Sequence, residues 1–137
     1  MHPNPTVRLI VVAPESHAPY SGMLPGFLAR AYTEDALFLD VAGLTEQAGG
    51  WFIRGELVAL DADRRAIQVR RPATLGGELL PEIHYDWASI NTGAAPRDAF
   101  PSTHAHLYYV KPLKHLLDQL PQIDATLEGP EKSLLVV

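Results

Sequence analysis

The sequence contains no cysteine among its 137 residues, so it can form neither a disulfide framework nor a thiolate metal site. Any redox chemistry must therefore come from a bound cofactor.

Basic residues are also few. Lys and Arg number 11 against 16 Asp and Glu, and the resulting net charge of −5 argues against a nucleic-acid surface. We expect no nucleic-acid partner.

Long apolar runs are missing as well. No stretch approaches the length that a bilayer requires, and residues 1–5 precede no long apolar segment, so we expect no transmembrane segment and a cytoplasmic location. The six histidines include one close pair, His104 and His106, but no third ligand lies at a metal-binding spacing, and we expect no metal site. A content of 47% hydrophobic and 20% charged residues fits one globular domain.

An apolar, largely β-branched run occupies residues 7–13 and is closed by Pro14. This pattern predicts a strand buried on both faces, as a parallel sheet requires. Glu15 follows at the carboxyl end, where open parallel sheets bind ligands and where an acid accepts hydrogen bonds from nucleotide ribose. The alternative is that Glu15 is a solvated residue in a turn.

The next segment, residues 19–26, contains two prolines and two glycines. Ser21 is suited to cap a helix and to leave the backbone N–H groups of its first turn available to an anion. Gly22 allows a ligand to approach the backbone closely. The segment therefore predicts a loop that cradles a phosphate-bearing cofactor.

The rest of the chain predicts a mixed α/β fold. Helices are expected where apolar residues recur at helical spacing, over about 23–31, 41–48 and 112–120. Asp40 caps the second of these helices, and Gly49 and Gly50 end it. Strands are expected over 51–60 and 66–71 as an antiparallel hairpin, over 83–90 as one or two further strands, and over 132–137.

Four segments together resemble the FAD domain of the pyridine nucleotide-disulfide oxidoreductase family: V-R-L-I-V-V-A-P-E-S-H-A-P-Y-S-G-M-L-P-G-F-L-A at 7–29, and residues 52–61, 85–93 and 110–112. Within that family the chain is most similar to the type II NADH dehydrogenase-like flavoproteins, including the one associated with selenide, water dikinase. The resemblance spans nearly the whole chain. It implies a truncated Rossmann-like FAD-domain fragment with a parallel strand layer and an antiparallel β-meander or hairpin.

The resemblance also implies FAD as cofactor and NAD(P)H as substrate of the complete enzyme, which passes electrons to a quinone or similar acceptor at the membrane surface. No catalytic residue is assigned. Asn91 stands where the family has Ala, and Lys111 has the alternative reading of a solvated lysine before a helix. The implied cofactor-binding residues are Glu15 at the adenosine ribose, Tyr20, Ser21, Gly22 and Met23 along the flavin and pyrophosphate, Leu57 at the adenine, Thr92 and Gly93 near the pyrophosphate, and Lys111 near the flavin edge.

Only fourteen residues precede Glu15, too few for the strand, glycine turn and helix of a dinucleotide-binding fingerprint. We therefore expect residues 1–137 to be a partial FAD-binding domain, in which 132–137 begin a second nucleotide-binding unit. As a fragment of an FAD-dependent NAD(P)H oxidoreductase, the chain would be inactive by itself and would hold FAD weakly or not at all. The alternative is a non-catalytic interaction or structural module that retains the fold without flavin.

The same reading predicts self-association. In a complete doubly wound sheet the first strand is central, so without that strand the one at 7–13 presents an unpaired edge. We expect a homodimer formed through exposed strand edges, with pairing of the carboxyl-terminal strand inside one monomer as the alternative.

Overall fold

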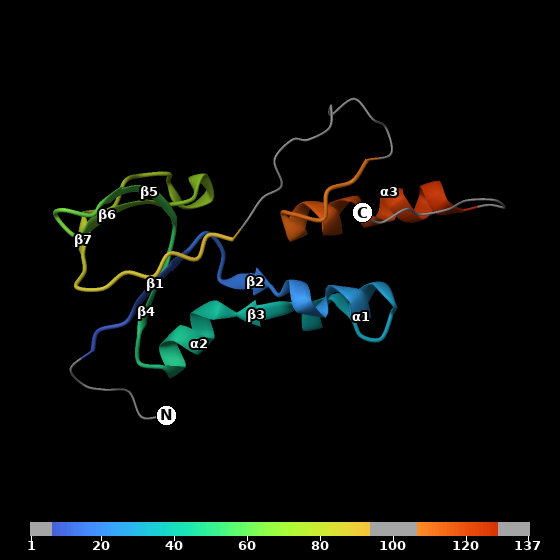
Figure 1. Cartoon of the computed structure of the whole chain (residues 1–137), viewed down its shortest axis with the longest axis horizontal. Coiled ribbons are helices and arrows are strands. Elements are labelled where there is room, and N and C mark those ends of the chain that lie inside the picture. Colours follow the sequence, from blue (N-terminus) through green and yellow to red (C-terminus); the bar gives the residue numbers. More distant parts are fainter. Residues whose placement is uncertain (1–6, 94–106, 129–137) are drawn as a thin grey trace. The chain divides into compact units, whose positions relative to one another are not determined.

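A computed structural model describes residues 7–93 and 107–128 of the chain. The chain divides into two compact units, Met1–Ile90 and Asn91–Val137, which are described separately. The first unit contains three small sheets, with strand orders β1-β4, β2-β3 and β5-β6-β7 (Figure 1). The predicted mixture of helices with parallel and antiparallel strands is confirmed. The parallel layer within the described residues consists of two strands.

The parallel sheet joins β1 (Ile10–Ala13) to β4 (Trp51–Arg54), with Ile10 opposite Trp51 and Ala13 opposite Arg54. Gly55 N–H donates to the Ala13 carbonyl oxygen at 2.9 Å and so extends the pairing by one residue. All four β1 side chains are half-buried. The strand itself is confirmed, but its predicted burial on both faces is wrong. Its side chains are only half-buried because a sheet of two strands covers each strand incompletely.

A second, antiparallel sheet joins β2 (His17–Pro19) to β3 (Phe38–Asp40). The sequence did not predict it, because strands of three residues are too short to show a period. Three short helices connect the two strands: η1 (Ser21–Met23), α1 (Leu24–Leu28) and η2 (Glu34–Leu37). The expected helix over 23–31 is thus replaced by a shorter one. Arg30 lies just beyond its end, at a positive φ of 58° that an α-helix does not contain.

The helix α2 (Val41–Gln47) agrees with its prediction. Asp40 caps it, because Gly43 N–H donates to Asp40 Oδ1 at 2.9 Å. Gly49 follows at a φ of 73°, the left-handed conformation that commonly ends helices. Thr45, the buried polar residue of this helix, donates from Oγ1 to the Val41 carbonyl oxygen at 2.7 Å and so has a hydrogen-bond partner.

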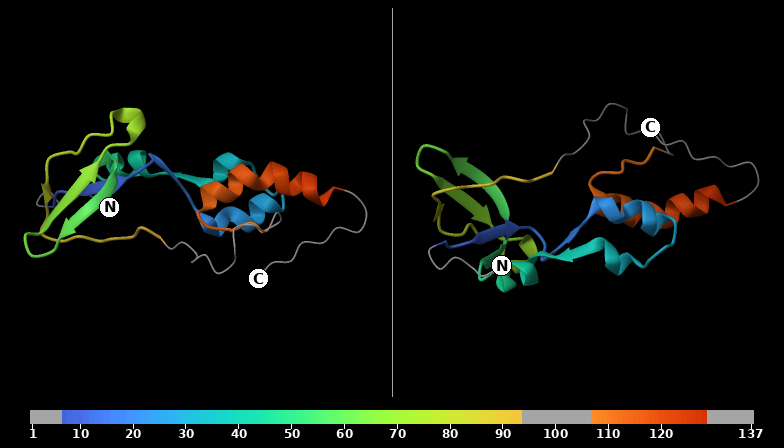
Figure 2. Two further views of the ribbon diagram at one scale, coloured as in Figure 1. Left: turned by 90° about the horizontal axis from the view of Figure 1, so that it is seen from above. Right: turned by 60° about the horizontal axis from the view of Figure 1, so that its bottom comes forward.

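The expected long strand over 51–60 is two strands that belong to different sheets. The chain leaves β4 at Gly55 and continues as β5 (Glu56–Asp61), which pairs antiparallel with β6 (Ala66–Arg70) (Figure 2). A Cβ on Gly55 would lie 2.5 Å from Val69 Cγ1 and 2.9 Å from the Arg70 carbonyl oxygen. Glycine therefore allows the chain to pass close to β6 as it changes sheets. The predicted hairpin itself is confirmed.

The third strand of this sheet, β7 (Ile83–His84), has two residues, so the strands expected over 83–90 are mostly wrong. The preceding loop contains the short helix η3 (Ala73–Leu75).

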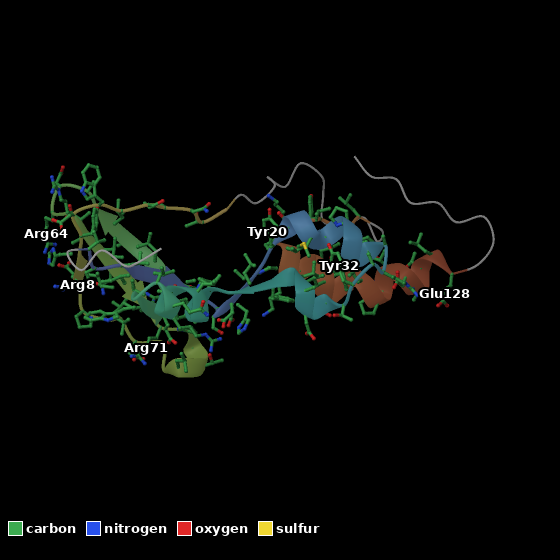
Figure 3. All side chains as sticks on the ribbon, turned by 90° about the horizontal axis from the view of Figure 1, so that it is seen from below. Arg8, Tyr20, Tyr32, Arg64, Arg71 and Glu128 are labelled. Atoms are coloured by element: carbon green, nitrogen blue, oxygen red, sulfur yellow. The ribbon has the colours of Figure 1, made fainter. Side chains whose placement is uncertain are left out.

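Two exposed ion pairs flank the sheet. Arg64 Nη2 lies 2.8 Å from Glu82 Oε2, and Arg71 Nε lies 3.1 Å from Glu78 Oε1. The hydrogen bonds that the Arg64 guanidinium donates to the Glu82 carboxylate raise the pKa of Arg64. Figure 3 shows Arg64 and Arg71 at opposite ends of the hairpin.

The second unit contains the helix α3 (Leu113–Leu127), which begins after Pro112 as predicted. It continues through Pro121 and ends later than expected. Although proline removes one backbone donor, the apolar stripe formed by Leu113, Leu116 and Ile123 extends past it. The strand expected over 132–137 lies outside the described residues. No helix in the described ranges is long and apolar enough to cross a membrane.

Candidate functional site

The carboxyl edge of the β1/β4 sheet brings together an acid and a base that lie far apart in the sequence. Parallel pairing ends both strands at the same edge, which places Glu15 beside Arg54. Arg54 Nη2 donates to Glu15 Oε2, and Arg54 Nε donates to the Pro14 carbonyl oxygen at 3.0 Å. The two side chains are 37% and 51% exposed. Glu15 therefore lies at the predicted sheet edge, with an arginine partner that the sequence reading missed.

A signal for Arg54 does exist in the sequence. Arg54 is the last residue before Gly55, where the chain changes sheets, and it lies opposite Ala13 in the register. Recognising it requires knowing that residues 51–54 pair in parallel with residues 10–13, whereas periodicity alone suggested one long strand. The position of Arg54 beside Glu15 is therefore a consequence of tertiary pairing.

The Glu15 carboxylate retains capacity for a ligand. A carboxylate has two oxygens and about four lone-pair positions, and the bond from Arg54 engages Oε2. The other oxygen, Oε1, can accept a hydrogen bond from a hydroxyl donor. A half-exposed acid at the ligand-binding edge of a parallel pair is suited to bind a vicinal diol, such as that of a ribose.

Residues 19–26 are folded differently from the predicted phosphate loop. Tyr20, not a serine, is the N-cap of η1, and no side-chain hydrogen bond caps either η1 or α1. The predicted capping role of Ser21 is therefore wrong. A Cβ on Gly22 would lie 2.9 Å from Tyr20 Cζ, so the Tyr20 ring covers the approach to this glycine. The Tyr20 side chain itself is half-exposed.

A second tyrosine holds the other half of the same segment. The Tyr32 hydroxyl donates to the Met23 carbonyl oxygen. A Cβ on Gly26 would lie 2.6 Å from the Tyr32 ring, so this glycine accommodates an aromatic side chain of the protein itself. Figure 3 shows Tyr20 and Tyr32 beside this group of short helices. The glycines thus have a packing role in the structure, which the sequence reading did not consider.

A shallow hollow lies beside the β2/β3 sheet. Its volume is about 480 Å³, and it is lined by His17, Asp35, Phe38 and Asp40. His17 Nε2 lies 3.9 Å from Asp40 Oδ1, and Ser16 Oγ lies 3.1 Å from His17 Nδ1. Within residues 7–93 and 107–128, no three histidine, aspartate or glutamate side chains are arranged to hold a metal ion. Because Asp40 Oδ1 also caps α2, this hollow is a weaker candidate than the Glu15 edge.

The remaining predicted residues belong to other segments of the chain. Leu57 pairs with Val69 in the hairpin, next to a register shift between Leu57 and Ala59. Thr92 and Gly93 are exposed and lie outside helices and strands, and Lys111 is exposed shortly before α3. These three residues belong to the second unit, whereas Glu15 and residues 20–23 belong to the first.

Comparisons of the chain with protein-family models, with curated proteins and with solved structures found no match. The functional assignment therefore depends on the chemistry of the sites. Of the arrangements described above, the pair Glu15 and Arg54 has the most defined geometry, because three groups from two strand ends converge there.

Proposed function

We propose that this chain is part of an FAD-dependent NAD(P)H oxidoreductase and contributes the adenosine end of its flavin site. The observation that carries the proposal is the position of Glu15 at the carboxyl end of β1, which pairs in parallel with β4. Nucleotides bind outside the carboxyl ends of parallel strands, and an acid at that place binds the ribose hydroxyls. In this assignment the Glu15 carboxylate accepts hydrogen bonds from the two hydroxyl groups of the adenosine ribose.

The order of the elements supports the same proposal. The parallel strands are followed directly by an antiparallel sheet of three strands, which is the arrangement expected from the resemblance to flavoprotein FAD domains. Leu57 lies on β5, near the point where the chain leaves the parallel sheet. FAD, when bound, supplies the hydride chemistry that carries electrons from NAD(P)H to an acceptor such as a quinone. The residues of this chain bind and orient the cofactor.

Equilibrium dialysis of FAD against the purified chain tests the proposal. We expect weak, saturable binding that Glu15→Ala lowers about tenfold or more, because a hydrogen bond to a charged acceptor contributes about 1.5–3 kcal/mol. Glu78→Ala is the matched control, since Glu78 also forms an exposed ion pair with an arginine but lies at the antiparallel sheet. Equal affinity of the wild type and Glu15→Ala, or no saturable binding by the wild type, would overturn the proposal.

A second candidate, a non-catalytic interaction module, is favoured by apolar surface on β5. Leu57, Val58 and Leu60 are 37%, 42% and 42% exposed. The edge of β1 that faces away from β4 also has no strand partner within the described residues. Strand edges of this kind associate readily, and the simplest partner is a second copy of the chain.

We propose in addition that the chain forms a homodimer through the outer edge of β1. The carbonyl oxygens of Leu9 and Ala13 accept hydrogen bonds from the N–H groups of Trp51 and Gly55. The backbone of the alternate residues Ile10 and Val12 therefore faces the outer edge. Light scattering at low concentration tests this. A mass near 15.0 kDa would refute the dimer, and twice that mass would support it.

A further inference from the structure

We propose that Arg54 is a positioning residue for the recognition of ribose, and that it holds the Glu15 carboxylate so that its second oxygen faces a nucleotide diol. The inference rests on the proposed function, in which Glu15 is the ribose ligand. It adds a residue that neither the sequence reading nor the resemblance assigned. The ligand class that it implies is an adenine nucleotide with free 2′- and 3′-hydroxyl groups.

The guanidinium is fixed at two points. Its Nε donates to the Pro14 carbonyl oxygen at 3.0 Å, and its Nη2 donates to Glu15 Oε2. Both acceptors belong to the segment that leaves β1, while Arg54 itself ends β4. A planar guanidinium bound at two of its nitrogens has little freedom to rotate. The carboxylate that it binds is therefore held in one orientation, although more than a third of each side chain is exposed.

This orientation has a consequence for binding. A glutamate that ends a strand without such a partner samples several rotamers, and fixing them costs free energy when a ligand binds. Arg54 lowers this cost by fixing Glu15 beforehand. The bond to Oε2 leaves Oε1 and the remaining lone pairs for the two hydroxyls of a ribose.

A purely structural role for the pair predicts something different. Exposed ion pairs contribute little to stability. If the pair were only structural, removal of Arg54 would change neither the free energy of unfolding nor the ligand selectivity measurably. The pair of Arg71 and Glu78 provides the comparison, because its atoms lie 3.1 Å apart and its side chains are 46% and 52% exposed. Neither of its residues contacts Glu15 or belongs to β1 or β4, because Arg71 follows β6 and its N–H donates to the Glu78 carbonyl oxygen at 2.9 Å.

The test compares the affinities of ADP and 2′,3′-dideoxy-ADP for the full chain by ligand-observed NMR titration. Their ratio measures recognition of the diol and is insensitive to changes that weaken both ligands equally. For the wild type we expect ADP to bind about tenfold or more tightly than the dideoxy analogue, and Glu15→Ala should bring the ratio to about one. Arg54→Met should lower the ratio at least threefold, and Arg71→Met should leave it unchanged.

Arg54→Lys separates charge from orientation. Lysine keeps the positive charge but lacks the planar fork that reaches both Pro14 and Glu15, so we expect it to lower the ratio as Arg54→Met does. A wild type that does not distinguish the two nucleotides would overturn the proposed function and this inference with it. A wild type that distinguishes them through Glu15, with an unchanged ratio in Arg54→Met, would overturn the role of Arg54 alone.

Discussion

The change of sheet at Gly55 predicts that alanine at this position destabilises the protein. The added Cβ would lie 2.5 Å from Val69 Cγ1 and 2.9 Å from the Arg70 carbonyl oxygen, and Val69 is fully buried. Relief of these contacts requires β5 and β6 to move apart, since one of the two atoms belongs to the backbone. Overpacking of this kind typically costs about 1–3 kcal/mol.

Part of this cost is offset. Replacing glycine with alanine restricts the unfolded chain and stabilises the folded state by about 0.4–1 kcal/mol where the backbone conformation allows it. We therefore expect Gly55→Ala to lower the free energy of unfolding by about 1–2 kcal/mol. For a unit of this size, 1 kcal/mol corresponds to about 4–8 °C in melting temperature.

Thermal and urea unfolding followed by circular dichroism measure this effect, and Gly22→Ala is the matched control. A Cβ on Gly22 would also be crowded, at 2.9 Å from Tyr20 Cζ, but that atom lies at the end of a side chain that is 54% exposed and can swing away. We expect a loss below about 0.5 kcal/mol for the control. If Gly55→Ala melts no lower than Gly22→Ala, the packing account of the sheet change is wrong.

Three further predictions concern the cap, an ion pair and the cofactor. Asp40→Ala removes the acceptor of the Gly43 N–H bond and should lower the free energy of unfolding by about 0.5–2 kcal/mol, whereas an equal melting temperature would contradict the capping role. Arg71→Met should change it by less than about 1 kcal/mol, because the pair with Glu78 is exposed; a larger loss in urea unfolding would show that the pair is structurally important. The purified chain should leave gel filtration without stoichiometric flavin, because the sequence contains no glycine turn before Glu15, and a yellow protein with one FAD per chain would refute this.

Local features of the fold were predictable from the sequence. The apolar run before Pro14 forms β1, Asp40 caps α2, and Gly49 follows that helix in the left-handed conformation. The turn after β5 is formed by residues that favour turns, with Arg64 N–H donating to Asp61 Oδ1 at 2.9 Å. Each of these features depends on residues that are neighbours in the sequence, where spacing and side-chain chemistry are sufficient evidence.

The site depended on tertiary pairing. The sequence determined that an acid follows an apolar strand, and hence that Glu15 lies at a sheet edge. Only the structure decided that residues 51–54 leave the apparent long strand, pair in parallel with β1 and place Arg54 against Glu15. Likewise, only the fold directs Tyr20 over Gly22, where a ligand was expected, and Tyr32 over Gly26. A periodic pattern shows which face of a strand is apolar, but its hydrogen-bond partners lie dozens of residues away, and long-range packing selects among them.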